Sequence, residues 1–321
     1  MTSPTPSDEL HVVVGAGGAS GRLVVRDLSR SGRRVRAVTR NGRDVGTPGV
    51  ELVAADALDV QAMTEVCRGA STVYFCAMPP LERWRSEFPV LTDSLISATA
   101  VSSARLVYAD DTWMYGRVQG PMTEETPYRP VSSKGTLRAW LAERLLHAGS
   151  AGRLPVSIVR AGELYGPGVR SMIARNVFAA AARGRTVRWF GNPDLPLTPT
   201  YIGDFASTLA AVGMHDKGQA ATWHVPHPGT TTGRRLAAMA CHLAGTELRL
   251  TAHGTRQVSL LGAVLPLARE AAELVYQYEQ PFVVDGSRAA SALEVSPTPY
   301  EDGVAAAMAE YGISLVSADP A

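Results

Sequence analysis

The sequence predicts an α/β protein built on a doubly wound parallel sheet. Three observations predict this fold: short apolar runs that suit buried strands, helical patterns that alternate with them from the first residues onward, and a glycine-rich turn directly after the first run. An uninterrupted apolar run fits a strand covered on both faces, and strand–helix alternation implies parallel strands joined by right-handed crossovers. Because ligands of such sheets bind outside the carboxyl ends of the strands, we expect functional residues just after each strand.

The expected elements follow one another without an internal repeat or a low-complexity linker. The first strand covers residues 11–14, and the helix after it runs from Ser20 to Arg30. Five more apolar runs repeat the strand pattern: Val35–Thr39, Val50–Ala54, Thr72–Cys76, Leu106–Ala109 and Val156–Val159. Helical segments lie between them, which predicts a parallel sheet.

The composition is that of an ordinary globular protein. The 321 residues are 45% hydrophobic and 19% charged, with 31 basic and 30 acidic side chains. Since no net field attracts phosphate, we expect no general binding to nucleic acid or to a membrane surface. The apolar stretch Val258–Leu267 is too short to span a bilayer. Cys67, Cys76 and Cys241 have no paired spacing, which predicts neither a disulfide framework nor a zinc site and favours a cytoplasmic location.

The glycines after the first expected strand predict a dinucleotide site. Gly15, Gly18 and Gly21 recur at every third position, with Gly17 between them. Residues without a Cβ let backbone N–H groups and the helix N-terminus approach a pyrophosphate. The alternative is a tight turn without a ligand, but its place at the head of the strand–helix series favours the dinucleotide. The expected contacts in this turn are Gly15, Gly17, Gly18, Ala19, Ser20 and Gly21.

The end of the second expected strand favours NADP(H) over NAD(H). An NAD site usually offers an acidic residue about 20 residues beyond the glycines, whereas this chain has TRN at 39–41. The Arg40 guanidinium can pair with a 2′-phosphate; alternatively, it is a solvated side chain in a loop that also carries Arg43. Asp56 is placed to accept from the adenine amine or to cap the helix that starts near Asp59. The other expected cofactor contacts are Asn41, Ala57, Cys76, Ala77, Met78 and Lys134.

Four motifs in order make the chain resemble a known family. They are VVVGAGGASG at the start, LVYADDTWMYG at Leu106–Gly116, SIVRAGELYGPG at Ser157–Gly168 and TYIGDFA at Thr200–Ala206. On these residues the chain resembles the extended short-chain dehydrogenases/reductases, the NAD(P)-dependent epimerase/dehydratase family. The motifs span most of the chain, so the resemblance extends to the whole architecture.

The resemblance implies two lobes with the active site between them. A Rossmann-like, NAD(P)-binding domain would cover residues 1–160 and 200–225, and a smaller, mostly C-terminal substrate-binding lobe would cover 161–199 and 226–321. The implied partner is a small-molecule substrate. A homodimer is the family's default assembly, and Trp140 would lie on the helix that forms its interface.

The resemblance also implies a catalytic pair that this sequence lacks. Family members carry a Ser or Thr after the fifth strand and a Tyr-x-x-x-Lys pair at the start of the next helix. The tyrosine transfers the proton, and the lysine lowers the tyrosine pKa and holds the nicotinamide ribose. Tyr128 is followed four residues later by Ser132, and the residue four before Lys134 is Pro130. The chain's other lysine, Lys217, has no tyrosine four residues before it either.

Two interpretations of this loss remain open. In the first, the protein is an NADP(H)-dependent oxidoreductase, epimerase or dehydratase that uses another acid/base. Asp111 falls where the family's Ser stands, and adjacent carboxylates can have one pKa raised by burial and repulsion. In the second, the protein senses NADP(H) or catalyses a non-redox lyase or cyclase reaction. The catalytic candidates are Asp111, Thr112, Lys134, Asp110 and Tyr115; the plainer alternatives are turn-capping carboxylates and a solvated lysine.

The expected substrate contacts follow the fifth and sixth strands and include the hinge motif. They are Trp113, Glu163, Tyr165 and Tyr201. Tyr165 and Trp113 would wall the pocket with aromatic faces, or else simply pack between the lobes.

Three further features are expected to be structural. Asp204 would anchor the start of the next helix. His224 and His227 stand three apart without a third ligand at suitable spacing, so no metal is expected. Residues Leu267–Tyr278 are expected to form an amphipathic helix.

Overall fold

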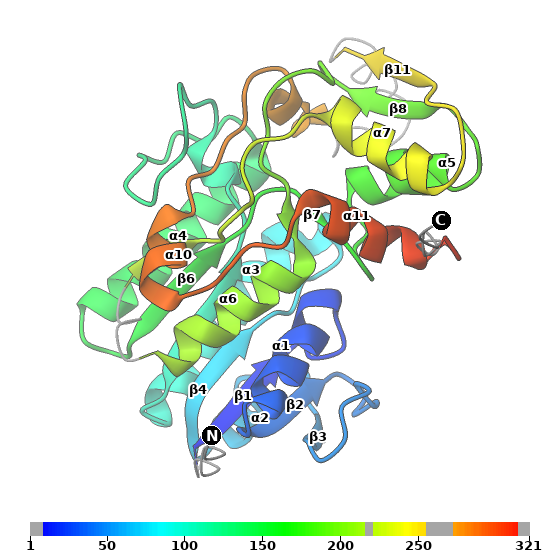
Figure 1. Cartoon of the computed structure of the whole chain (residues 1–321). Coiled ribbons are helices and arrows are strands. Elements are labelled where there is room, and N and C mark those ends of the chain that lie inside the picture. Colours follow the sequence, from blue (N-terminus) through cyan, green and yellow to red (C-terminus); the bar gives the residue numbers. More distant parts are fainter. Residues whose placement is uncertain (1–8, 216–220, 255–271, 314–321) are drawn as a thin grey trace.

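A seven-stranded sheet forms the body of the computed structural model, which describes residues 9–215, 221–254 and 272–313. All its strands are parallel, in the order β10-β6-β5-β4-β1-β2-β3 (Figure 1). They are β1 (Leu10–Val14), β2 (Arg34–Thr39), β3 (Glu51–Ala54), β4 (Ala70–Phe75), β5 (Arg105–Asp110), β6 (Val156–Arg160) and β10 (Ala221–His224). The order reverses between β1 and β4, and doubly wound sheets bind their ligands at such a reversal.

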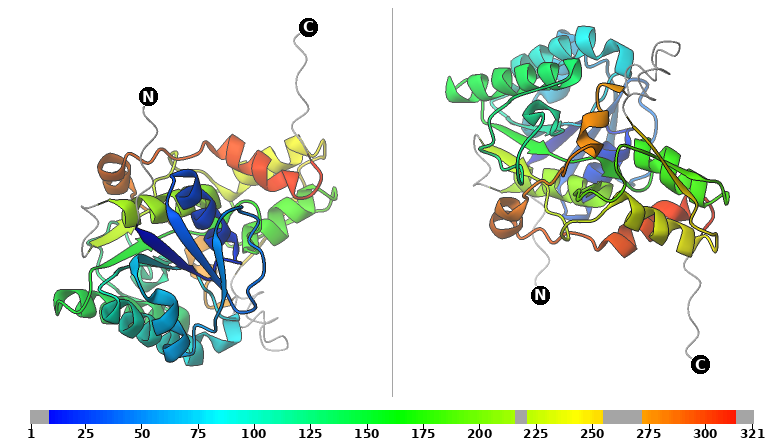
Figure 2. Two further views of the ribbon diagram at one scale, coloured as in Figure 1. Left: turned by 90° about the horizontal axis from the view of Figure 1, so that it is seen from below. Right: turned by 90° about the horizontal axis from the view of Figure 1, so that it is seen from above.

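Helices cover both faces of this sheet (Figure 2). One face carries α1 (Ala19–Arg30) and α6 (Ile202–Met214), and the other carries α2 (Val60–Cys67), α3 (Trp84–Val101) and α4 (Ser133–Ser150). The two cores explain why β1 is apolar throughout. Val13 packs with the side chains of α1 and α6, whereas Val12 and Val14 pack with those of α2 and α3. The doubly wound α/β fold predicted from the sequence is thus confirmed.

A smaller lobe lies beyond the carboxyl ends of the strands, at the upper right of Figure 1. It is built from β8 (Val187–Phe190), β11 (Leu250–His253), η3 (Ala174–Phe178), α5 (Ala179–Ala181), α7 (Gly233–Leu243) and α11 (Tyr300–Ala309). Trp189 is buried at the centre of its core. A second short sheet pairs β7 (Leu164–Tyr165) with β9 (Thr200–Tyr201).

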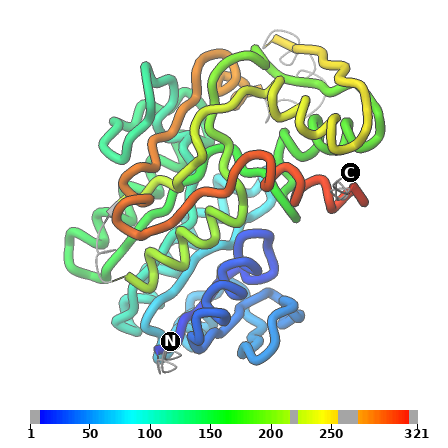
Figure 3. Tube along the Cα trace, viewed as in Figure 1, coloured from blue at the N-terminus to red at the C-terminus, as the bar shows by residue number. Residues whose placement is uncertain are grey.

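The chain returns from the smaller lobe to the main sheet before it ends. In Figure 3 the orange segment runs back beside α6, and the red segment then re-enters the smaller lobe. The returning segment contains α10 (Ser287–Leu293), whose Ala289 and Leu293 share a core with α6. Asp204 of α6 accepts hydrogen bonds from the N–H of Thr298 at 2.9 Å and from its hydroxyl at 2.6 Å. Asp204 therefore ties this segment to the start of α6.

The strands expected from the sequence are all present, with ends that differ by at most two residues. The helix expected over Leu267–Tyr278 is wrong at its C-terminal end. Its first residues, up to 271, lie outside the described part of the chain, and its last ones form the 3₁₀ helix η4 (Val275–Tyr278). Tyr276 packs against Phe282 while Tyr278 packs against Trp189 in another core, and this short turn serves both contacts. Two other 3₁₀ helices are η1 (Leu81–Arg83) and η2 (Trp113–Tyr115).

None of the helices within 9–215, 221–254 and 272–313 combines the length and the apolar character needed to cross a bilayer. The three cysteines are buried and unpaired with one another.

Gly213 provides a test of the packing between α6 and the sheet. A Cβ at this position would overlap the hydroxyl of Tyr74, whose ring is buried and whose hydroxyl is 3.0 Å from His11 Nδ1. We expect Gly213→Ala to lower the free energy of unfolding by about 1–3 kcal/mol, although alanine favours helices. Urea unfolding measures the change. Gly254→Ala, where a Cβ meets nothing within 4 Å, is the control; equal effects would contradict the packing described.

Candidate active site

The glycine-rich turn between β1 and α1 fits the diphosphate of a dinucleotide. Gly15 has φ +83°, and a Cβ there would overlap the backbone of Ala77 at the end of β4. A Cβ at Gly21 would overlap the Gly15 carbonyl oxygen, so the helix packs directly on the turn. Gly18, the N-cap of α1, has no side chain that could accept from the first-turn N–H groups, so these groups remain available to a phosphate.

The loop after β2 brings an arginine onto this turn. Arg43 Nη2 donates to the Gly17 carbonyl oxygen at 3.1 Å, whereas Arg40 is exposed at the end of the strand. The structure thus places Arg43, and not Arg40, against the glycine-rich turn. Asp59, not Asp56, caps α2, because its carboxylate accepts from the N–H groups of the helix. The remaining expected contacts line the neighbouring strand ends: Asn41, Asp56, Ala57, Cys76, Ala77 and Met78.

A buried carboxylate joins the ends of β5 and β6. Asp110 is the last residue of β5 and pairs in register with Arg160, the last residue of β6. Asp110 Oδ2 is 3.4 Å from Arg160 Nε, and its Oδ1 is 3.3 Å from Arg138 Nη1 of α4. The three side chains are at most 2% exposed. Since a buried charge is costly without a partner, each of the three depends on the others.

Arg160 also fixes the protons of a buried tyrosine and histidine. It donates to the hydroxyls of Tyr115, at 2.6 Å, and of Tyr128. The Tyr115 hydroxyl lies 2.6 Å from His224 Nε2, and His224 Nδ1 lies 3.1 Å from the Asp285 carbonyl oxygen. That carbonyl can only accept, so Nδ1 carries the proton and Tyr115 donates to Nε2. Burial, with the nearby Arg160 charge, lowers the pKa of His224 to about 3, so its ring is neutral.

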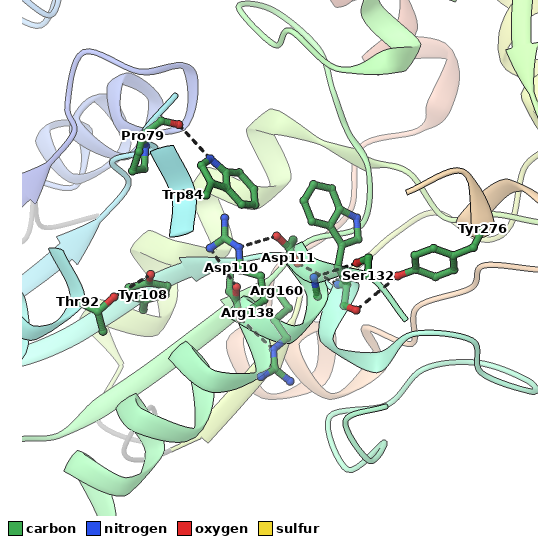
Figure 4. Close-up of polar contacts among 12 residues, drawn as sticks. Pro79, Trp84, Thr92, Tyr108, Asp110, Asp111, Ser132, Arg138, Arg160 and Tyr276 are labelled. Atoms are coloured by element: carbon green, nitrogen blue, oxygen red, sulfur yellow. Dashed lines mark hydrogen bonds and ion pairs between the residues drawn. The ribbon is translucent and has the colours of Figure 1, made fainter. Parts of the chain in front are cut away.

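Asp111 also pairs with Arg138, but at a different nitrogen of the guanidinium from Asp110 (Figure 4). Its Oδ1 accepts from the Trp113 N–H at 2.9 Å, and its Oδ2 lies 2.9 Å from Arg138 Nε. The Trp113 bond is the turn-capping contact that the sequence left as an alternative to catalysis. Burial raises the pKa of Asp111 to about 6; the Arg138 charge opposes this shift and the Asp110 charge adds to it. The Arg138 guanidinium lies 4.5 Å from the ring centre of Trp84, which fixes it further.

Lys134 is buried at the start of α4. The helix is capped by Ser132, whose Oγ accepts from the Gly135 N–H at 3.0 Å. Lys134 is 4% exposed and forms an ion pair with Glu273, a carboxylate that also accepts from the Ser133 N–H at 2.8 Å. The alternative left open for Lys134, a solvated side chain, is therefore excluded. The sequence did not point to Glu273, because it lies far along the chain in a segment with no recognised motif.

The expected substrate residues form two groups: Glu163 and Trp113, which interact with Asp111, and Tyr165 and Tyr201, whose rings pack together. Glu163 Oε1 accepts from the Met172 N–H at 3.1 Å, and burial raises the pKa of Glu163 to about 7, with a smaller upward contribution from Asp111. Trp113 is half-buried and stacks on Trp84, with ring centres 5.6 Å apart. Tyr165 instead lies in the core of the smaller lobe, packed against Phe178, Tyr201 and Tyr300. The structure therefore favours packing between side chains, and not a wall of the substrate pocket, as the role of Tyr165.

The remaining catalytic candidates are enclosed. Thr112 is 1% exposed, and the Tyr115 ring is fully buried. His227 turns back on its own loop, where its Nδ1 accepts from the Gly229 N–H at 3.1 Å. Within the described residues, no group of three His, Cys, Asp or Glu side chains could hold a metal ion.

The raised pKa of Glu163 makes folding stability depend on pH. From about pH 4.5 to 7 the folded protein retains a proton that the unfolded chain releases, so wild-type stability falls as the pH rises through this window. We expect Glu163→Gln, which cannot ionise, to lose this part of the slope. Urea unfolding between pH 5 and 8 measures it. The exposed Glu125→Gln is the control, and a Glu163→Gln slope as steep as that of wild type would refute the assignment.

Comparisons with known proteins identify the family of the chain. The model of the NAD dependent epimerase/dehydratase family matches residues 11–224. The chain is 27% identical, over 78% of its length, to 84% of the dTDP-6-deoxy-L-talose 4-dehydrogenase (NAD(P)(+)) of Kitasatospora kifunensis. It superposes on MoeE5 in complex with UDP-glucose and NAD with a TM-score of 0.75, at 22% identity over 95% of this chain and 98% of that one.

A second solved structure gives the same result. The UDP-glucuronic acid 4-epimerase of Bacillus cereus, in complex with NAD, superposes with a TM-score of 0.77 at 16% identity, over 94% of this chain and 98% of that one. These structural likenesses concern the fold, and the family model covers more than half of the sequence. The chain belongs to the NAD-dependent epimerase/dehydratase family.

Proposed function

We propose that the protein is an NADP(H)-dependent oxidoreductase, epimerase or dehydratase that acts on a small substrate with a hydroxyl or carbonyl group. Its proton-transfer group is not the family's Tyr-x-x-x-Lys pair. One observation carries this proposal: Asp111 and Lys134 are held by buried ion pairs where β5 ends and α4 begins, at the carboxyl side of the sheet. Sugar nucleotides are the first substrates to test, because the relatives named above act on or hold them.

The cofactor preference rests on the loop after β2. A bound nicotinamide dinucleotide supplies the oxidising or reducing equivalents of such a reaction. The turn of Gly15 and Gly18 would hold its diphosphate, and the guanidinium groups of Arg40 and Arg43 would hold a 2′-phosphate. No carboxylate stands at residues 39–41 to bind an unsubstituted ribose.

The second candidate is a non-redox NADP(H)-binding protein. It is favoured by the state of Asp111, both of whose oxygens already contact groups of the protein itself. The two candidates differ in whether the cofactor turns over. Purified protein with NADPH and a panel of carbonyl compounds and sugar nucleotides separates them, with the nicotinamide absorbance and the sugar products both followed. Tight NADPH binding without any cofactor or product change would favour the second candidate.

The two arginines test the cofactor preference. We expect Arg40→Ala and Arg43→Ala each to weaken NADPH binding about 10-fold, as the loss of a hydrogen bond to a charged group does, and to leave NADH binding unchanged. Titration of tryptophan fluorescence measures both affinities. Arg235→Ala, an exposed residue of the smaller lobe, is the control. Equal losses for the two cofactors would show that the arginines do not read the 2′-phosphate.

A further inference from the structure

Two buried cations stand one turn apart at the start of α4. Lys134 and Arg138 are 4% and 2% exposed, and a spacing of four places them on the same face of the helix. Each is paired with a carboxylate from another part of the chain, Glu273 for Lys134 and Asp111 for Arg138. Desolvating two cations so close together is costly, and a helix start needs no cation for its own stability.

The surroundings join these two ion pairs into one site. The Gly135 backbone lies so near the Trp113 carbonyl oxygen that a Cβ there would come within 2.5 Å of it. The Tyr276 hydroxyl donates to that same oxygen at 3.4 Å, and the charges of both Asp111 and Glu273 raise the pKa of Tyr276, beyond the larger effect of burial. Tyr276 therefore lies at the contact between η2 and the first turn of α4, within electrostatic range of Asp111 and Glu273.

We propose that Lys134 is the residue that exchanges a proton with the substrate oxygen, and that Arg138 is a positioning residue that holds Asp111 beside it. This inference rests on the proposed function. The four-residue spacing of the two cations equals that of the tyrosine and lysine that the family resemblance implies.

The chemistry of the side chains separates their roles. Arg138 cannot lose its proton in a protein, and its guanidinium lies against the rings of Trp84 and Phe88, 4.5 and 4.3 Å from their centres. Asp111 would have to break its contact with Trp113 or Arg138 to move. Lys134 combines an exchangeable proton with a flexible four-carbon stem.

The proton balance is simple in the reducing direction. An N–H bond of the Lys134 ammonium breaks and an O–H bond forms on the substrate oxygen, while the nicotinamide of the proposed function reduces the carbonyl carbon. The neutral amine then recovers a proton from water through the Glu273 carboxyl, whose side chain is 23% exposed. Oxidation of a hydroxyl follows the same steps in reverse.

The scarcity of lysine gives a test that does not need turnover. An amine-reactive ester followed by mass spectrometry reports Lys134 and Lys217 separately, since the chain has no other lysine. We expect saturating NADPH to slow the labelling of Lys134 several-fold and to leave Lys217 unchanged. Unchanged labelling of Lys134 when fluorescence shows NADPH bound would overturn the proposal. Because Lys134 is 4% exposed, a folded protein in which it does not react at all is decided by the substitutions below. A failure to bind NADPH would instead count against the proposed function.

Substitutions give the second test, with whichever panel substrate is turned over. Lys134→Arg keeps the charge for Glu273 but cannot release a proton. We expect it to bind NADPH like wild type and to lose at least about 100-fold in kcat, the usual contribution of a general acid. Arg138→Lys should lower kcat about 10- to 100-fold by misplacing Asp111, with KM and NADPH affinity kept. Lys217→Arg is the control, and a Lys134→Arg protein with wild-type kcat would refute the role of Lys134.

Discussion

The carboxylate of Asp110 is shared by two guanidinium groups in a place that solvent does not reach. Arg160 comes from the neighbouring strand and Arg138 from the helix that covers it, so one ion cluster fixes β5, β6 and α4 relative to one another. Removing one partner of such a cluster typically costs about 3–5 kcal/mol, because it leaves a charge buried without compensation. The positions of Tyr115, Tyr128 and Asp111, which contact these two arginines, depend on it.

Each arginine extends the cluster in a different direction. Arg160 donates hydrogen bonds to the hydroxyls of Tyr115 and Tyr128, and the Tyr115 hydroxyl in turn donates to His224 at the end of β10. Arg138 pairs with Asp111 as well. The first branch is closed within the protein and connects the ends of β6 and β10 with η2. The second leads to Lys134 one turn earlier on α4, whose ion pair with Glu273 connects the start of this helix to the C-terminal segment.

The sequence was sufficient for those features that depend on local pattern. Apolar runs located six of the seven strands of the main sheet, and the spacing of Gly15, Gly18 and Gly21 located the turn. Local pattern could not identify Arg138, Arg160 or Glu273, because a guanidinium or a carboxylate is buried only where a partner from another element meets it. Two signals were nonetheless present: Arg138 stands four residues after Lys134 on one expected helix, and Arg160 directly follows an expected strand beside the one that ends at Asp110. The aromatic walls were anticipated only in part, because the pattern around Tyr165 is the same whether the ring packs or binds.

The same cluster limits how a proton can move at the site. Burial raises the pKa of Tyr115 and lowers that of His224 to about 3, so neither changes its protonation state near neutral pH. Both guanidinium groups stay charged. The tyrosine that the family resemblance implies has no counterpart in the first turn of α4, where Ser132 caps the helix and Lys134 follows. A reaction at this site that needs a proton must therefore draw on the remaining candidates that the sequence named, Asp111, Glu163 or Lys134. Of these three, only Lys134 lies on the helix turn that the missing tyrosine would occupy.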